Sequence, residues 1–254
     1  MRREYIDSMP DLHATWLSHL RRQQQRWLDA LPSLCAVCGR WPGPRICHDC
    51  HARWAGQKHR CHGCALPLPS LVSLCGSCLL QPPRLQRCIS VLDYAYPWQD
   101  LITRYKFQAD LGLARSLGRL MTGHPEVREL LRTCGPLLPM PTSSERVRER
   151  GFDHCLLLAH ALSEQYDRPL PLLNGAVQRK HLERPQHASS REQRLRRLRD
   201  VFSLVPARRP LIEGQDIVLL DDVMTTGATL DALARCLLSA GAASVSAVVL
   251  ARTP

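Results

Sequence analysis

The hydrophobic and polar positions of residues 85–254 alternate between two periodicities. Short apolar runs typical of strands occur at 89–96, 137–141, 217–220 and 245–251, and helical spacing occurs at 101–121, 152–165 and 230–240. Gly112 interrupts the first helical stretch, and Pro97 follows the first strand. The last three segments form a strand–helix–strand unit, which closes as a right-handed parallel crossover. The pattern predicts an α/β domain with a parallel sheet flanked by helices.

The N-terminal residues 1–34 have a helical pattern of their own. Over residues 5–32 apolar side chains such as Trp16, Leu20 and Trp27 recur at helical spacing, and Pro32 is expected to end the helix. Such a helix can lie on a membrane surface or on a partner, or remain partly disordered. We interpret it as a helical extension packed on its own chain.

Residues 35–80 contain few apolar runs, so they cannot build an ordinary core. They hold four Cys-x-x-Cys pairs, and each pair can present two thiolates to one tetrahedral Zn²⁺. The eight candidate ligands are Cys35, Cys38, Cys47, Cys50, Cys61, Cys64, Cys75 and Cys78. Taking the first four for one zinc and the last four for the other is the simplest grouping, and an interleaved grouping would use the same residues. The sequence therefore predicts a double zinc ribbon with two structural sites, followed by the linker Pro82-Pro83.

Redox-active pairs are the competing interpretation of Cys-x-x-Cys, but four pairs without a thioredoxin-like setting favour zinc. In a cytosolic chain, twelve cysteines argue for metal binding rather than disulfides, because the cytosol keeps thiols reduced. The four outside the pairs (Cys88, Cys134, Cys155 and Cys236) are expected to be small buried apolar residues. We find no signal-peptide pattern and no apolar run of the ~20 residues that span a bilayer, so we expect a cytoplasmic protein without a transmembrane segment.

A buried strand leading into a polar turn and then a helix is the strongest chemical signal. Four apolar residues, 217–220, precede the segment Asp221, Asp222, Val223, Met224, Thr225, Thr226, Gly227, Ala228 and Thr229. Backbone N–H groups at the start of a helix, threonine hydroxyls and a glycine that allows close approach together form a cup for a phosphate. Asp221 and Asp222 are then placed to contact ribose hydroxyls, directly or through Mg²⁺, and to stabilise positive charge on the sugar ring. The alternative is an ordinary helix capped by Thr225 or Thr226.

The segment resembles the motif of type I phosphoribosyltransferases, which bind phosphoribosyl pyrophosphate (PRPP) or a related ribose 5-phosphate ligand. The absence of Gly-x-x-x-x-Gly-Lys-[Ser/Thr] and of Gly-x-Gly-x-x-Gly argues against a P-loop NTPase or a dinucleotide-binding fold.

The net charge of the chain is +11, and only Lys58, Lys106 and Lys180 among its 34 basic residues are lysines. Arginine pairs bidentately with phosphate, so a phosphate-rich ligand or nucleic acid is indicated; an arginine-rich solvated surface is the alternative. Residues 179–199 alone carry eight basic and two acidic residues, or +6, and could close over pyrophosphate or follow a nucleic-acid backbone. The candidate pyrophosphate or nucleic-acid contacts are Arg148, Arg150, Arg179, Gln186 and Arg196.

The combination of modules over about residues 34–254 resembles the ComF/GntX family of amidophosphoribosyltransferase-like proteins. Further matching features are Tyr94-x-x-Pro97, Lys106-Phe107, Arg148-x-Arg150-Gly151-Phe152, Arg179, Gln186, Arg196 and Phe202. The chain has Asp153-His154 where the family usually has Asn-Gln, and Arg197 where it usually has Asn. The resemblance implies a phosphoribosyltransferase fold for residues 85–254 and a role in natural competence or DNA utilisation, handling single-stranded DNA alongside DNA-uptake proteins.

Three functional hypotheses follow. The chain could be an enzyme that binds Mg-PRPP and lets a nucleophile attack C1 of the ribose as pyrophosphate leaves, with Asp221 and Asp222 as catalytic residues. It could be a non-catalytic adaptor for single-stranded DNA that uses the same site as a sensor, although few aromatic residues (5%) are available for base stacking. It could also be a protein–protein scaffold built on the zinc module.

Overall fold

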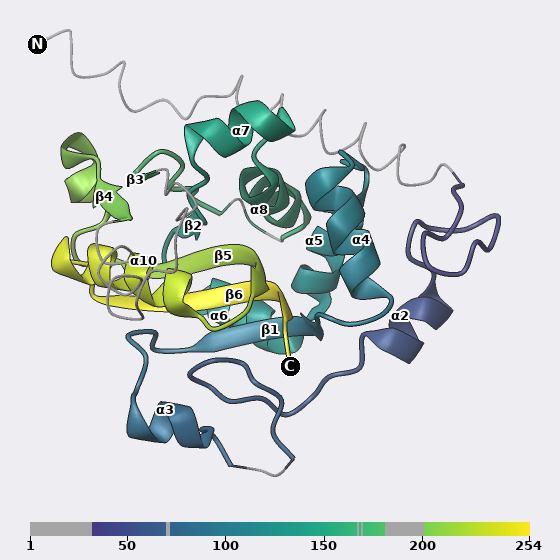
Figure 1. The fold of residues 1–254 in the computed structure, drawn as a ribbon, viewed down its shortest axis with the longest axis horizontal. Helices are drawn as coiled ribbons and strands as arrows, with labels where there is room; N and C mark the ends of the chain where they lie inside the picture. The colour runs from purple at the N-terminus through teal and green to yellow at the C-terminus, as the bar shows by residue number, and fades with distance from the viewer. Residues whose placement is uncertain (1–31, 70–71, 167, 169, 181–200) are drawn as a thin grey trace, which may run out of the picture. The chain divides into compact units, whose positions relative to one another are not determined.

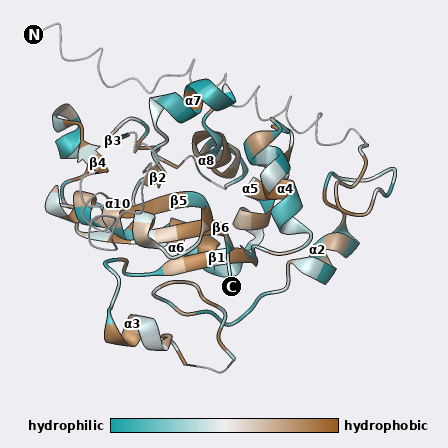
Figure 2. Cartoon of the chain, viewed as in Figure 1, coloured by the Kyte–Doolittle hydropathy of each residue, from teal (hydrophilic) through white to brown (hydrophobic). Residues whose placement is uncertain are grey.

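The computed structural model describes residues 32–69, 72–166, 168, 170–180 and 201–254 (Figure 1). Four parallel strands form its main sheet, in the order β1 (Cys88–Asp93), β6 (Ser244–Arg252), β5 (Asp216–Met224) and β2 (Leu137–Pro139). The middle strands β5 and β6 are hydrophobic along most of their length (Figure 2), as strands covered on both faces must be. The predicted parallel sheet with flanking helices is confirmed.

Helices cover the sheet. α4 (Trp98–Phe107), α5 (Leu113–Gly123) and α8 (His154–Gln165) lie together in Figure 1, and α8 contacts β2 and β5. The short α6 (Pro125–Thr133) follows α5, and the hydrophilic α7 (Ser144–Arg150) precedes α8 and has no buried residue. α5 and α8 approach closely at Gly118, where a Cβ atom would lie 3.1 Å from backbone atoms of α8. A larger residue there would push the two helices apart.

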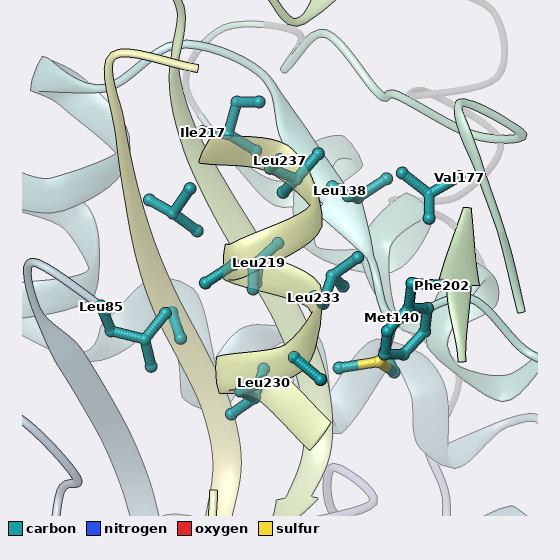
Figure 3. Close-up of a cluster of buried hydrophobic side chains, with 14 of the residues drawn as sticks. Leu85, Leu138, Met140, Val177, Phe202, Ile217, Leu219, Leu230, Leu233 and Leu237 are labelled. Atoms are coloured by element: carbon teal, nitrogen blue, oxygen red, sulfur yellow. The ribbon is translucent and has the colours of Figure 1, made fainter. Parts of the chain in front are cut away.

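α10 (Ala228–Ser239) packs against β5 in a cluster of buried hydrophobic side chains (Figure 3). Leu230, Leu233 and Leu237 on this helix meet Ile217 and Leu219 of β5. Because successive side chains of a strand point to opposite faces, Val218 and Leu220 face the other layer of helices. By the same alternation, Asp221 and Asp222 near the end of β5 point to opposite faces of the sheet and have different neighbours.

A two-stranded antiparallel hairpin, β3 (Val177–Arg179) with β4 (Phe202–Leu204), stands outside the main sheet and contacts α10 through β4. A 3₁₀ helix, η1 (Pro206–Leu211), leads from it to β5. The basic segment that joins β3 to β4 falls at 181–200, and the expected N-terminal helix falls almost entirely at 1–31. Both expectations therefore lie outside the described residues.

The cysteine-rich region contains α2 (His48–Trp54) and α3 (Gly76–Leu80). The chain divides into two compact units between Cys50 and His51. The second group of paired cysteines, residues 61–78, therefore belongs to the same unit as the sheet. That residues 35–80 fold as a separate zinc-binding domain remains a prediction. No helix in the described ranges is both long and apolar enough to cross a bilayer.

Most predicted elements are present, with two kinds of difference. β1 ends at Asp93, before the predicted Tyr96, and β5 continues to Met224, past the predicted end at Leu220. The sequence pattern also gave no indication of α6, α7 or the hairpin. Asp221 and Asp222 are thus strand residues. Side chains from other elements bind their carboxylates, so the two acids can lie within the sheet.

Candidate functional site

The turn after β5 presents two threonines at the surface and leads into a helix with a glycine as its N-cap residue. Thr225 and Thr226 are exposed, and Gly227 has a φ of 78° and precedes the first residue of α10. A Cβ atom on Gly227 would lie 2.4 Å from the Cε atom of Met224, and this left-handed conformation is one that other residues rarely adopt. The N-cap residue Gly227 offers α10 no side chain, and the Ala228 amide donates a long hydrogen bond of 3.4 Å to the Thr226 hydroxyl. The first N–H groups of α10 have no acceptor within the helix, so they can bind an anion.

The two acids before the turn are held by different partners. Asp222 is 2% exposed, with the Lys106 ammonium 2.7 Å from its Oδ2 atom and Nε2 of His154 3.5 Å away. Asp221 is partly exposed; its Oδ1 atom accepts a hydrogen bond from the Asp222 amide at 2.9 Å and from the Cys155 thiol at 3.4 Å. A cation neutralises Asp222, whereas the two groups that donate to Asp221 within the described part of the chain are neutral.

This asymmetry separates the acid strengths of the two carboxyl groups. Burial, and next the negative charge of Asp222, raise the pKa of Asp221 to about 7. Burial also opposes ionisation of Asp222, but Lys106 and His154 outweigh it and hold its pKa below the ordinary value. The pair therefore carries one firm negative charge and one carboxyl that changes charge near neutral pH.

His154 connects the acid pair to an arginine. The Arg150 guanidinium lies 3.1 Å from Nδ1 of His154, and because arginine has only donors, Nδ1 must be the acceptor. The ring proton is then on Nε2, facing Asp222. Burial lowers the pKa of His154 to about 4, which agrees with this neutral form. Arg150 also lies over the Phe107 ring at 5.0 Å, so its position is fixed on two sides.

The other candidate anion contacts have varied surroundings. Arg148 is exposed beside Glu145 at 3.5 Å, and Arg179 lies 5.6 Å over the Phe202 ring, where burial lowers its pKa. A pocket of about 430 Å³ opens where β2, α8 and β3 meet, and Arg179 lines it with Thr142 and Asp153. Gln186 and Arg196 lie outside the described residues.

The paired cysteines gather in two clusters in sequence order. The first cluster comprises Cys35, Cys38, Cys47 and Cys50, and the second comprises Cys61, Cys64, Cys75 and Cys78. Neighbouring sulfur atoms lie 3.9, 3.7 and 3.6 Å apart in the pairs Cys35–Cys50, Cys38–Cys47 and Cys64–Cys75. A tetrahedral Zn²⁺ with bonds of about 2.3 Å requires sulfur separations of about 3.8 Å. Both clusters therefore have the dimensions of a zinc site.

Backbone amides support one thiolate in each cluster. The Cys47 amide points at Cys35 Sγ from 3.4 Å, and the Cys75 amide points at Cys61 Sγ from 3.2 Å. Burial opposes thiolate formation, but these and neighbouring amides outweigh it and lower the pKa to about 6 for Cys35 and about 7 for Cys61. Thiolates are the form that binds metal.

Sequence reasoning missed three residues of the site. Lys106 was noted only within a motif, His154 only as a departure from the family pattern, and Cys155 was expected to be a plain buried apolar residue. Cys155 is buried, as expected, but its thiol also contacts Asp221. The adjacent acids after an apolar run were the available signal, because buried carboxylates require a cation or donors from elsewhere in the chain.

The chain is similar in sequence to several known proteins. Residues 153–254 match the family model "Phosphoribosyl transferase domain". The DNA utilization protein YhgH of Escherichia coli K12 is 35% identical over 239 residues, which cover 88% of this chain and 98% of that protein. Competence protein F of Haemophilus influenzae is 31% identical, covering 82% and 90%. Competence protein ComFC of Bacillus subtilis is 29% identical, covering 84% and 86%.

Proposed function

The chain belongs to the ComF family, whose phosphoribosyltransferase-like domain it carries, and we propose that it binds PRPP at the end of β5 as part of a role in DNA utilisation. One observation carries the ligand assignment. An exposed Thr-Thr-Gly turn leads into a helix whose N-cap residue is a glycine, directly beside a pair of acids, one neutralised and one free to meet a ligand. A sugar phosphate offers both the anion and the hydroxyl groups that such a site satisfies.

Each part of the site has a role in this proposal. The amides of α10 and the hydroxyls of Thr225 and Thr226 hold the 5-phosphate, and Asp221, the more accessible acid, accepts hydrogen bonds from the ribose hydroxyls. Asp222 stays buried and keeps Lys106 in place. Arg150 and Arg179 supply positive charge for pyrophosphate. Mg²⁺ arriving with PRPP would neutralise part of the pyrophosphate charge, and the carboxylate oxygens of Asp221 are donors that it prefers.

The reaction that such a site supports is transfer of the phosphoribosyl group. A nucleophile such as an amine forms a bond to C1, the bond from C1 to the pyrophosphate oxygen breaks, and pyrophosphate leaves with the electron pair. Asp221, when ionised, stabilises the positive charge that develops on the ring, because Asp222 is already paired with Lys106. Release of pyrophosphate in the presence of an acceptor would establish turnover, and PRPP binding without release across a broad acceptor panel would exclude it.

Calorimetric titration of Mg-PRPP into the wild type and a Thr225→Val/Thr226→Val variant tests the binding proposal. Both threonines are exposed, so the variant should fold normally while losing two donors to a charged phosphate. We expect the wild type to bind one equivalent and the variant to bind roughly 10- to 100-fold more weakly. Thr122→Val on α5 is the matched control. Equal affinity in all three proteins, or no binding by the wild type, would remove the proposal.

We also propose that both cysteine clusters hold zinc and that the thiols place the protein in a reducing compartment, the cytoplasm. Metal analysis of the purified full chain is expected to give two zinc ions per molecule, and Cys75→Ser one. A zinc content that does not fall in the variant would contradict the assignment. Strong chelators should lower the melting temperature of the wild type, because metal binding contributes to folding free energy.

A second candidate function, binding of single-stranded DNA, is favoured by exposed aromatic rings beside arginines. Tyr96 and Phe107 are 60% and 63% exposed; Arg150 lies over Phe107, and Trp54, with Arg53 at 5.0 Å, meets Tyr96 edge-on. Rings of this kind can stack bases while the arginines bind phosphates.

We expect Tyr96→Ala/Phe107→Ala to weaken binding of an oligonucleotide by roughly 10-fold or more, as followed by fluorescence anisotropy. The affinity of the wild type should also fall steeply as salt is raised, because phosphate contacts release counterions. An affinity that does not depend on salt, or is unchanged in the double variant, would rule out this surface. Leu79→Ala at an exposed position of α3 serves as the control for lost apolar area.

A further inference from the structure

The second cysteine cluster is hydrogen-bonded to β6, the strand paired with β5, which leads into the Thr-Thr-Gly turn. Arg252, the last residue of β6 and 8% exposed, donates from Nε to the carbonyl oxygen of Cys64 at 3.0 Å. β6 is paired with β5, with Arg252 opposite Met224, and the amide of the next residue, Thr253, donates to the Met224 carbonyl at 3.0 Å. The cluster is thereby connected to Met224, the last residue before the turn, through the Arg252 side chain and the pairing of β6 with β5.

A second contact supports the same end of β5. The Cys88 amide, at the start of β1, donates to the carbonyl of His62 within the cluster at 2.7 Å. The Cys88 thiol in turn lies 3.5 Å from the sulfur of Met224. The side chain of Met224 lies where a Cβ of Gly227 would be, so its packing bears directly on the turn.

The segment that follows the cluster contacts the first turn of α10, the helix that begins directly after the Thr-Thr-Gly turn. Arg84 binds the carboxylate of Asp231 twice, through its backbone amide at 3.0 Å and its guanidinium at 2.6 Å. Asp231 lies in the first turn of α10, where a free carboxylate would repel a phosphate held at the helix N-terminus. Arg84 neutralises that carboxylate.

A pocket of about 460 Å³ separates the cluster from the turn. Its lining includes Cys64, Cys75 and Cys78 of the cluster together with Thr226 and Gly227 of the turn. Three cysteines of the second cluster therefore line a pocket that also includes residues of the proposed phosphate site.

We propose that the second cysteine cluster positions the phosphate-binding turn, with Arg84 and Arg252 as the positioning residues. The metal-bound cluster presents the Cys64 carbonyl to Arg252 and orients the chain that carries Arg84, so it fixes both ends of the turn. Loss of zinc then loosens the turn and lowers its affinity for phosphate. The effect on affinity rests on the proposed PRPP binding, whereas the ordering of the turn does not.

Hydrogen exchange of the 225–230 amides in the full chain tests the ordering without any ligand. Cys75→Ser should lose one zinc and increase exchange in this segment about 10-fold or more. The matched control, Cys47→Ser, removes a ligand from the first cluster, which belongs to the other compact unit. It should also lose one zinc but leave exchange at 225–230 as in the wild type. Unchanged exchange in a Cys75→Ser protein that has lost its zinc would overturn the proposal.

The Arg84–Asp231 pair tests the electrostatic part while both zinc ions stay bound. Arg84→Gln should weaken Mg-PRPP binding about three- to fivefold, since the pair is partly exposed and the field of one carboxylate is screened. Arg84→Lys should retain most of the affinity, and Arg84→Gln/Asp231→Asn should restore it, because no charge is then left unpaired. Unchanged affinity in Arg84→Gln, or no recovery in the double variant, would overturn the role of Arg84. If the wild type bound no PRPP, all titrations would be flat and the proposed function would fail, while the exchange experiment would still decide the coupling.

Discussion

Asp221→Asn is expected to raise the melting temperature at neutral pH while weakening PRPP binding roughly 10- to 100-fold. Asparagine has nearly the same size as aspartate and carries no charge. Burial and the neighbouring Asp222 raise the pKa of Asp221 to about 7 in the folded chain, whereas an unfolded aspartate titrates near 3.8. Ionisation of Asp221 therefore opposes folding. A ligand that uses the carboxylate loses a charge-assisted contact in the variant.

The sign of the pH dependence follows from the raised pKa. Below about pH 4 both states are protonated and Asp221 has no effect on stability; between about pH 4 and 7 the penalty grows, and above pH 7 it is complete. The variant should thus match the wild type near pH 4 and gain on the order of 2 kcal/mol, or about 5 °C, by pH 8. Melting curves at pH 4, 6 and 8 provide the test. A variant less stable than the wild type at pH 8, or a gain that does not vary with pH, would contradict this description of the acid pair.

Lys106→Met is expected to lower the free energy of unfolding by about 3–5 kcal/mol. The ammonium lies 2.7 Å from Asp222, a carboxylate that is 2% exposed, and methionine would fill the space without supplying a charge. Asp222 would then be an uncompensated buried charge, which is among the most costly defects in a protein interior. Urea unfolding at pH 7 measures the loss.

Two further variants show whether the loss comes from the buried charge. Lys106→Met/Asp222→Asn should recover most of the stability, because the unpaired carboxylate is gone. Lys58→Met is the matched control: Lys58 binds Asp93, but its side chain is 56% exposed, so the change should cost less than about 1 kcal/mol. Equal losses for Lys58→Met and Lys106→Met, or a double variant no more stable than Lys106→Met, would show that burial of Asp222 is not the cause.

The sequence predicted the elements that depend on local patterns. Apolar runs identified β5 and β6, and helical spacing identified α8 and α10, because these elements bury wide faces. The end of β5 was predicted wrongly, because two adjacent acids are usually exposed. Here the strand continues since Lys106, from a helix 116 residues earlier, neutralises Asp222. Short elements such as α7, with no buried residue, leave no periodic signal.

In the candidate site, too, the sequence predicted what depends on local spacing and missed what depends on tertiary contacts. Cys-x-x-Cys spacing indicated which cysteines would gather, but it did not choose between sequential and interleaved grouping, which depends on how the backbone turns between the pairs. Nor could it reveal that the chain after the second cluster meets α10, because Arg84 and Asp231 are 147 residues apart. Contacts between residues so far apart in the sequence depend on tertiary packing, and local sequence patterns do not predict them.

The most direct test of the central claim is to follow amide chemical shifts of the ¹⁵N-labelled full chain while ribose 5-phosphate is added. This ligand carries the 5-phosphate and the ribose hydroxyls without the pyrophosphate group. We expect the largest changes at the amides of 225–230, with smaller ones at Asp221 and Asp222, and in the Thr225→Val/Thr226→Val protein the same changes only at much higher ligand concentration. Shifts that leave the turn unchanged, or that appear only at arginines elsewhere, would contradict a phosphoribosyl site at the end of β5.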